Sequence, residues 1–282
     1  MTEVVEAIFE TVAATAPEVR AGLVGRREYQ EKENPSGERK LAADIHADQL
    51  FEERLLAIEG VASYASEERE TVTGDAYGDG YHVAVDPLDG SSNLKSNNAM
   101  GTIVGIYEEP LPAAGEHLVA SGFVLYGPIT NMVTAVEGTV TEYALDDGKR
   151  IAVAEDVALP DEPTVYGFGG RVPDWPEDFE RFVRGIEQEL KLRYGGAMIA
   201  DVNQVLTYGG IFAYPALESN PDGKLRLQFE GNPIAYVVES AGGGSSDGNQ
   251  SLLSVEATEL HQRVPLHVGN TVLIDRLERA LG

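Results

Sequence analysis

Val85-Asp86-Pro87-Leu88-Asp89-Gly90-Ser91-Ser92-Asn93 is the stretch around which the rest of the chain is organised. Residues 81–85 are typical of a short buried strand, which runs into two acids three positions apart, and Pro87 keeps Asp86 extended. Gly90 to Asn93 then provide backbone N–H groups and hydroxyls that suit an anion. Acids beside an anion cradle indicate a bridging Mg²⁺ or Mn²⁺, and therefore metal-assisted chemistry on a phosphate ester. The alternative is an ordinary turn, which Asp, Pro and Gly also favour.

Length and composition limit the class of protein. The chain has 282 residues, 43% of them hydrophobic, which is enough for one large domain or two closely packed ones. No run of about 18 apolar residues is present, so we expect no membrane span. The acidic N-terminus lacks the features of a secretory signal, and a cytoplasmic location is the expectation. The absence of cysteine excludes disulfides, thiolate metal sites and cysteine nucleophiles.

The charge balance is strongly acidic. Forty-seven acids face 21 bases, of which only six are lysines, and the formal net charge is −26. The negative electrostatic potential of such a protein opposes binding to nucleic acid or to anionic membranes. Apolar periodicity nevertheless indicates a folded chain rather than a disordered one. An acidic surface with few lysines favours the hypothesis of a halophile enzyme, whose self-repulsion is screened by concentrated salt.

The first half predicts helices backing a largely antiparallel sheet. Apolar spacing indicates helices over 2–23 and 41–58, and the segment 25–40 is expected to be a mobile loop. Alternating or apolar runs predict the strands. They are 61–64, 81–85, 101–107, a hairpin of 120–126 with 131–136, and 139–144.

The second half predicts a separate α/β lobe. The Pro-, Gly- and Asp-rich segment 156–175 is the best boundary, so we expect lobes over 1–158 and 159–282. Helices are predicted over 177–190, 198–208, 232–240 and 271–281. Strands are predicted at 191–194, 211–214, 225–230, 252–255 and 265–268. The fold class expected from these elements is α/β.

Motifs over most of the chain resemble one family. They are Ala65–Glu68, Asp86–Asn93, Gly101–Tyr107, Ala200–Val202, Tyr208–Ala216, Gly223–Leu227, Glu230–Pro233 with Ala235–Val237, and His261–Arg263. In this order and spacing they resemble the class I fructose-1,6-bisphosphatases, in a halophilic archaeal form, within the metal-dependent sugar and inositol phosphatases. The resemblance implies a layered α-β-α-β-α sandwich and gluconeogenic hydrolysis of the 1-phosphate of fructose 1,6-bisphosphate, giving fructose 6-phosphate.

The resemblance also implies a metal site. Side chains of Glu67, Asp86, Asp89 and Glu230, with the carbonyl of Leu88, would hold two or three Mg²⁺ ions, and Mn²⁺ is an alternative. Four converging carboxylates would repel one another without cations, so binding should weaken at low pH. Taken alone, adjacent Glu67 and Glu68 are typical of solvated surface charge.

Two acids are candidates for handling the attacking water. The resemblance implies that Asp44 and Glu68 orient or deprotonate it, and the sequence leaves open which of them takes the proton. Asp44 can equally be a first-turn acid that complements the dipole of its helix.

Substrate contacts follow from the same resemblance. Gly90, Ser91 and Ser92 would hold the phosphate that is cleaved, and Asp89 also belongs to the substrate site. The sugar and its 6-phosphate would meet a second group, which consists of Arg193, Tyr194, Tyr214 and Lys224. Arg193 would come from a neighbouring subunit, which implies a homodimer or homotetramer. Lys224 can alternatively be a turn lysine, and Tyr214 a core residue.

The chain departs from the family in places. The family's Asn-Glu-Gly-Tyr phosphate-binding segment reads Gly167-Phe168-Gly169-Gly170-Arg171 here, with Arg171 as the candidate substitute. Basic residues of the family's AMP site are replaced by Gly80 and Glu108, so we expect no inhibition by AMP. Two alternatives stay open. One is a phosphatase of sedoheptulose 1,7-bisphosphate or another sugar or inositol phosphate, and the other is a non-catalytic phosphosugar-binding module.

Overall fold

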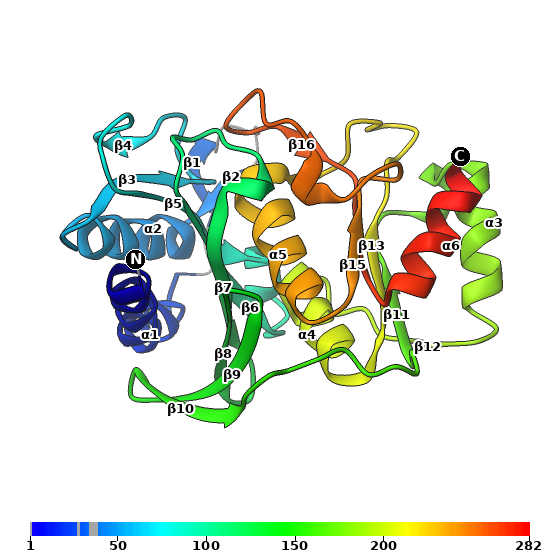
Figure 1. Ribbon diagram of the computed structural model, residues 1–282, viewed down its shortest axis with the longest axis horizontal. Helices are drawn as coiled ribbons and strands as arrows, with labels where there is room; N and C mark the ends of the chain where they lie inside the picture. Colours follow the sequence, from blue (N-terminus) through cyan, green and yellow to red (C-terminus); the bar gives the residue numbers. More distant parts are fainter. Residues whose placement is uncertain (1, 27–28, 34–38) are drawn as a thin grey trace.

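Five layers of helix and sheet make up the fold in the computed structural model, which describes residues 2–26, 29–33 and 39–282 (Figure 1). Helices α1 (Thr2–Gly22) and α2 (Ala42–Leu55) form the first layer. Helices α4 (Met198–Tyr208) and α5 (Asn232–Ser240) lie between two sheets, and α3 (Glu177–Ile186) and α6 (Thr271–Leu281) cover the far side. The expected α-β-α-β-α sandwich is confirmed.

Within the described residues, the first sheet has eight strands in the order β10-β9-β8-β7-β6-β5-β3-β4. They are β3 (Val61–Ser66), β4 (Thr73–Gly74), β5 (Tyr81–Asp89), β6 (Met100–Tyr107), β7 (Leu118–Tyr126), β8 (Thr130–Val136), β9 (Thr139–Asp146) and β10 (Lys149–Ala154). Neighbours pair antiparallel except β3 and β5, which are parallel. The parallel pair brings the carboxyl ends of both strands to one edge, where ligands commonly bind in α/β folds.

The second sheet has the order β12-β11-β13-β17-β15. Its strands are β11 (Val165–Phe168), β12 (Lys191–Leu192), β13 (Gly210–Tyr214), β15 (Gly244–Ser246) and β17 (Leu266–Gly269). β12, β11 and β13 run parallel, and β17 is antiparallel to both of its neighbours. Two short ladders pair β1 (Tyr29–Glu33) with β2 (Arg39–Leu41), and β14 (Leu225–Arg226) with β16 (Arg263–Val264).

Three of the four hydrophobic clusters among the described residues pack helices against the sheets. One packs Phe9 and Phe51 of the first two helices on the outer face of the first sheet. A second fills the middle layer, where α4 and α5 contact both sheets. A third packs Phe179 of α3 and Leu277 of α6 on the second sheet. α3 and α6 bury the apolar faces that their sequence periods predict, whereas the buried face of α2 also carries Asp44 and Asp48.

Several sequence predictions were wrong in detail. The segment 25–40 is not simply a loop, because β1 and β2 pair within it, and residues 27, 28 and 34–38 lie outside the described part. β11, an inner strand of the second sheet, lies in the segment 156–175 and was not predicted as a strand. The predicted strand 225–230 is β14 followed by a π-helical turn, η4 (Leu227–Gly231), and 252–255 is mainly a single 3₁₀ turn, η5 (Leu252–Ser254). The sequence analysis missed β4, β10, β15 and β16.

The remaining short elements are 3₁₀ turns. They are η1 (Ser91–Leu94), η2 (Gly115–His117) and η3 (Val172–Asp174). Among the described residues, no helix combines the length and the apolar character that crossing a membrane would require.

Candidate active site

A pocket of about 550 Å³ collects the predicted site residues from both halves of the chain. Its lining consists of Asp44, Glu67, Glu68, Asp86, Leu88, Asp89, Gly90, Ser91, Ser92, Tyr194, Gly196, Met198, Asp201, Phe212, Tyr214, Lys224, Leu225, Arg226 and Glu230. Of the residues predicted for the site, all line the pocket except Arg193 and the candidate substitute Arg171. The pocket lies at the edge where β3 and β5 end, as the parallel pairing of those strands requires.

A β-bulge between β5 and β6 sets the direction of the Asp86 and Asp89 side chains. Asp86 pairs with Ile103 and Asp89 with Gly101, so β5 has one residue more than β6 between these two pairs. Pro87 lies within this bulge, where its missing N–H leaves no ladder bond unmade. Asp86 Oδ1 accepts the N–H of Leu88 at 2.9 Å, and Asp89 Oδ2 accepts that of Ile199 at 2.8 Å. Both carboxylates are buried and fixed by backbone donors.

Glu230 reaches the same place from the π-helical turn η4. Its Oε2 accepts a hydrogen bond from the N–H of Arg226 at 2.6 Å. Arg226 directly precedes η4, so this bond holds the Glu230 carboxylate against the start of the turn. π-turns are rare and concentrate at functional sites. Asp86, Asp89 and Glu230 each offer a carboxylate oxygen, and these atoms lie within 4.8 Å of one another.

The electrostatics of this cluster are unfavourable without a cation. Burial, and then the charges of Glu67, Asp89 and Glu230, raise the pKa of Asp86 well above its usual value. Burial also raises the pKa of Asp89 to about 6. Burial and the neighbouring Glu67 and Asp89 charges raise the pKa of Glu230. A set of hard oxygen donors that resists ionisation in this way fits a divalent cation such as Mg²⁺.

Glu67 and Glu68 occupy the turn that follows β3. The N–H of Glu67 donates to Val85 O of β5 at 3.1 Å, and that of Glu68 donates to Ser66 Oγ at 3.2 Å. The Glu67 side chain is only 16% exposed, and Arg226 Nη2 lies 3.9 Å from its Oε1. Solvated surface charge therefore does not describe Glu67, which lies within the acidic pocket.

Asp44 both stabilises the start of its helix and lines the pocket. Its Oδ2 accepts the N–H of Leu41 at 2.7 Å, which caps the start of α2. The same side chain is buried and lines the pocket. Its helix therefore delivers a fixed carboxyl group beside the turn of Glu67 and Glu68.

The small residues after Asp89 pack closely on the second half of the chain. Gly90 has a φ of +73°, and a Cβ there would lie 2.2 Å from Cβ of Ala197. Only glycine fits both conditions. The next residues form η1, and Asn93 Nδ2 donates to Gly195 O at 2.9 Å. The predicted phosphate cradle, Gly90 to Ser92, is thus held against the N-terminal end of α4.

The pocket is also lined by aromatic groups and a lysine. Lys224 Nζ lies 5.6 Å from the ring centroid of Tyr214. Burial raises the pKa of Tyr194 to about 12, so its hydroxyl keeps its proton. A Cβ at Gly169 would lie 2.3 Å from the Tyr214 ring, which explains why a side chain is lacking at that position of the departed segment. Arg171 is exposed and is not among the residues that line the pocket.

Arg193 does not join the pocket of its own chain. Its side chain is exposed, and its Nη1 donates to Leu192 O at 3.2 Å. It directly precedes Tyr194, which does line the pocket. Its placement is therefore compatible with a contact to another subunit, which a single chain does not display.

Two charged residues of the pocket were given no role by the sequence analysis. Asp201 is buried in the first turn of α4, where its Oδ1 accepts the N–H of Gly195 at 2.7 Å, and burial raises its pKa to about 7. Arg226 is 2% exposed, and its Nη1 donates to Lys224 O at 2.7 Å. Both lie inside the family-like motifs, which was the available signal. The sequence did not predict their burial, because an acid in the first turn of a helix and an arginine in an alternating strand are usually exposed to solvent.

Comparison with known proteins agrees with this geometry. Residues 1–154 match the family model described as fructose-1-6-bisphosphatase, N-terminal domain, and residues 159–282 match the corresponding C-terminal domain. The chain belongs to the class 1 fructose-1,6-bisphosphatase family. A relative with that name from Natronomonas pharaonis is 62% identical over 282 residues, covering 100% of both chains. One from Haloarcula marismortui is 58% identical, covering 98% of this chain and 94% of its own.

Solved structures support the same assignment. The holo form of Leishmania major fructose-1,6-bisphosphatase superposes with a TM-score of 0.88 at 28% identity, covering 100% of this chain and 93% of that one. Its T-state has a TM-score of 0.84 at 29% identity, covering 99% of this chain and 92% of that one. The family resemblance is therefore confirmed, and the similarity to relatives from halophilic archaea confirms its archaeal form.

Proposed function

We propose that this pocket hydrolyses the 1-phosphate of fructose 1,6-bisphosphate, releasing fructose 6-phosphate and inorganic phosphate for gluconeogenesis. The observation that carries the proposal is the triad Asp86, Asp89 and Glu230, whose oxygens lie within 4.8 Å of one another in a pocket that Gly90 to Ser92 also line. Family membership and the name shared by its relatives support the substrate.

The acids would hold the metal ions. We assign Glu67, Asp86, Asp89 and Glu230 as side-chain ligands and Leu88 as a carbonyl ligand to two or three Mg²⁺, with Mn²⁺ as a substitute. Such ions, when bound, activate a water and neutralise charge on the phosphoryl oxygens. Backbone donors already fix one oxygen each of Asp86, Asp89 and Glu230, so the ligands are positioned before metal binds.

The remaining residues handle the proton and the substrate. Asp44 or Glu68 accepts a proton from the attacking water as the water oxygen bonds to phosphorus. The bond from phosphorus to the C1 oxygen breaks, and that oxygen leaves with the electron pair and takes up a proton from solvent water to become the C1 hydroxyl. The N–H groups of Gly90, Ser91 and Ser92 hold the phosphoryl oxygens. At the other end, Tyr194, Tyr214 and Lys224 bind the sugar and its 6-phosphate, and Asp89 also contacts the substrate.

A panel assay tests the proposal. Phosphate release is measured from sugar and inositol phosphates in molar KCl with Mg²⁺ or Mn²⁺. We expect fructose 1,6-bisphosphate to be preferred and Asp89→Ala to abolish release. Preference for sedoheptulose 1,7-bisphosphate or an inositol phosphate would overturn the substrate assignment. Absence of any release would favour the non-catalytic phosphosugar-binding module.

Organisation and setting complete the proposal. We assign lobes 1–158 and 159–282, which the separate matches to 1–154 and 159–282 support. The active unit is a homodimer or homotetramer in which Arg193 reaches a neighbouring site.

We place the protein in the cytoplasm, because a sugar bisphosphate is too highly charged to cross a membrane. The formal charge of −26 is unfavourable for nucleic acid or anionic membrane partners. Absence of AMP inhibition stays a prediction.

A further inference from the structure

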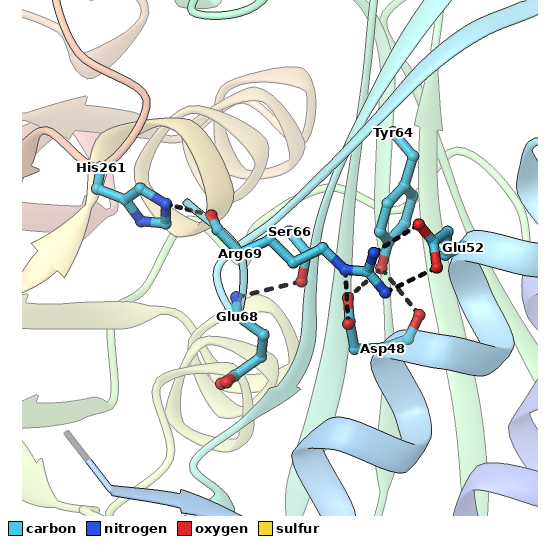
Figure 2. A network of polar contacts seen from close by, with 7 residues as sticks. All are labelled: Asp48, Glu52, Tyr64, Ser66, Glu68, Arg69 and His261. Carbon is cyan, nitrogen blue, oxygen red and sulfur yellow. Dashed lines mark hydrogen bonds and ion pairs between the residues drawn. The ribbon is translucent and has the colours of Figure 1, made fainter. Parts of the chain in front are cut away.

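Outside the pocket, Arg69 is the centre of a polar network around the turn of Glu67 and Glu68 (Figure 2). Its Nε donates to Asp48 Oδ2 at 2.7 Å, and its two terminal nitrogens donate to the two oxygens of Glu52, at 2.8 Å for Nη2. Asp48 and Glu52 lie one turn apart on α2, so the planar guanidinium binds two carboxylates on one face of that helix. A lysine cannot reproduce this fork.

Asp48 is itself fixed from the other side. It is buried, and the hydroxyl of Tyr64 donates to its Oδ1 at 3.1 Å. Tyr64 is fully buried in β3, two residues before Ser66. The Arg69 guanidinium also lies 5.9 Å from the centroid of the Tyr64 ring. The side chain of Arg69 therefore ties the end of β3 to α2 through partly buried, charge-assisted bonds, which salt screens less than exposed pairs.

The backbone of Arg69 makes two further contacts. Its N–H donates to Ser66 O at 3.0 Å, which closes the turn that carries Glu67 and Glu68. Its carbonyl accepts a 2.6 Å hydrogen bond from His261 Nε2. The His261 ring lies 5.2 Å from that of Phe229, the residue before Glu230. Arg69 thus contacts two elements that bring acids to the pocket, α2 with Asp44 and the turn after β3, and it is linked to η4 through His261.

We propose that Arg69 is a positioning residue that sets the Glu67–Glu68 turn relative to Asp44 and Glu230. It does not line the pocket, so it acts through the acids and not on the substrate. This inference rests on the proposed function, since it assigns Arg69 to the geometry of the metal-binding acids. Without the hydrogen bonds from the Arg69 guanidinium to Asp48 and Glu52, the Glu67–Glu68 turn is no longer held in place. The acids then bind a cation less tightly because their oxygens no longer converge.

The test measures metal binding directly. Mn²⁺ is titrated into the substrate-free protein in molar KCl and free Mn²⁺ is followed by electron paramagnetic resonance. We expect Arg69→Met to weaken Mn²⁺ binding roughly 10-fold or more, as loss of a group that orients metal ligands does. The KM for fructose 1,6-bisphosphate at saturating Mg²⁺ should change less than about 2-fold. Arg69→Lys should recover part of the Mn²⁺ affinity.

Arg276→Met is the matched control. It removes an arginine ion pair, from Nη1 to Glu189 Oε2 at 2.9 Å, in the outer layer of α3 and α6. Its Mn²⁺ affinity should equal that of the wild type. Wild-type affinity in Arg69→Met would overturn the positioning role. Should Arg69→Met not fold, Arg69→Lys decides: weaker Mn²⁺ binding supports the role and unchanged binding overturns it.

The outcome separates this inference from the proposed function. A wild-type protein that neither binds Mn²⁺ nor releases phosphate would contradict the proposed function itself. A wild type that does both, beside an Arg69→Met variant that binds Mn²⁺ equally well, would contradict only the role of Arg69.

Discussion

Oδ2 of Asp89 accepts a 2.8 Å hydrogen bond from the backbone N–H of Ile199, in the first turn of α4. An acid at the end of a strand in the first sheet is thus held by a helix of the second half. The positive end of the helix dipole favours the ionised carboxylate, although burial opposes it. The two halves of the chain are therefore joined at the acid cluster, and each half needs the other to complete it.

Asp89→Asn tests the charge of this acid while keeping its shape. The amide oxygen can still accept from Ile199, so we expect the fold to persist. Phosphate release should fall roughly 100-fold or more, because a neutral amide is a poor ligand for Mg²⁺. Asp275→Asn, on the exposed face of α6, is the matched control and should keep full activity. More than a tenth of wild-type activity in Asp89→Asn would speak against a ligand role.

The raised pKa of Asp89 predicts how metal and pH act together. Its folded, metal-free value is about 6 against an ordinary 3.8, so the fold favours the protonated form. The resulting stabilisation is present below about pH 4 and is lost as pH rises through 6. Mg²⁺ binds the ionised form and should offset that loss. The rise in Tm caused by Mg²⁺ should therefore be larger at pH 7.5 than at pH 5, and equal rises would refute this linkage.

Lys224→Met separates substrate binding from metal binding. Lys224 lines the pocket beside Tyr214, and it would form a charge-assisted bond with phosphate. Such bonds are worth about 1.5–3 kcal/mol, so kcat/KM should fall roughly 10- to 100-fold. The Mg²⁺ concentration for half-maximal activity should not rise, because Lys224 is not an assigned metal ligand and its positive charge acts on Asp89. Lys149→Met, on exposed β10, is the control, and an unchanged kcat/KM in Lys224→Met would favour the turn-lysine interpretation.

Mixing two inactive variants tests whether Arg193 serves a neighbouring subunit. Asp89→Asn lacks an acid of its own site, and Arg193→Ala lacks the residue that its partner would use. A mixed dimer then contains one complete site, built from Asp89 of one subunit and Arg193 of the other. Co-refolded mixtures should recover activity that neither variant shows. No recovery in proven mixed oligomers would place Arg193 outside the site.

Salt dependence tests the halophile hypothesis. A net charge of −26 on 282 residues repels itself strongly unless concentrated ions screen it. We expect dialysis from molar KCl to low salt to cause loss of structure, measured by circular dichroism. A melting curve that does not change with molar KCl would count against the hypothesis.

The acid-bearing segments were predictable because their signals are local. Asp86 to Asn93 carries its turn, its cradle and two acids within one short stretch, and the helices over 198–208 and 271–281 follow from apolar spacing and match the observed bounds. The family resemblance then assigned Glu67, Asp44 and Glu230 to the same site.

What the sequence did not reveal depends on distant contacts. Glu230 lies on a π-turn and not at a strand end, because its carboxylate bonds the N–H of Arg226 four residues earlier. β11 was taken for a boundary because its Gly-containing run is stabilised by strands that flank it in space, β12 and β13. Arg69 was given no role from the sequence, because only the packing of α2 against β3 brings Asp48 and Glu52 to it. Contacts between segments that are distant in the sequence produce no periodic pattern in the sequence itself.

The most direct test of the central claim is a crystal structure of the protein soaked with Mn²⁺, read by anomalous scattering. We expect anomalous peaks between Asp86, Asp89 and Glu230, with Glu67 and the Leu88 carbonyl as further ligands. A well-ordered crystal in which these carboxylates have no Mn²⁺ peak beside them would contradict it.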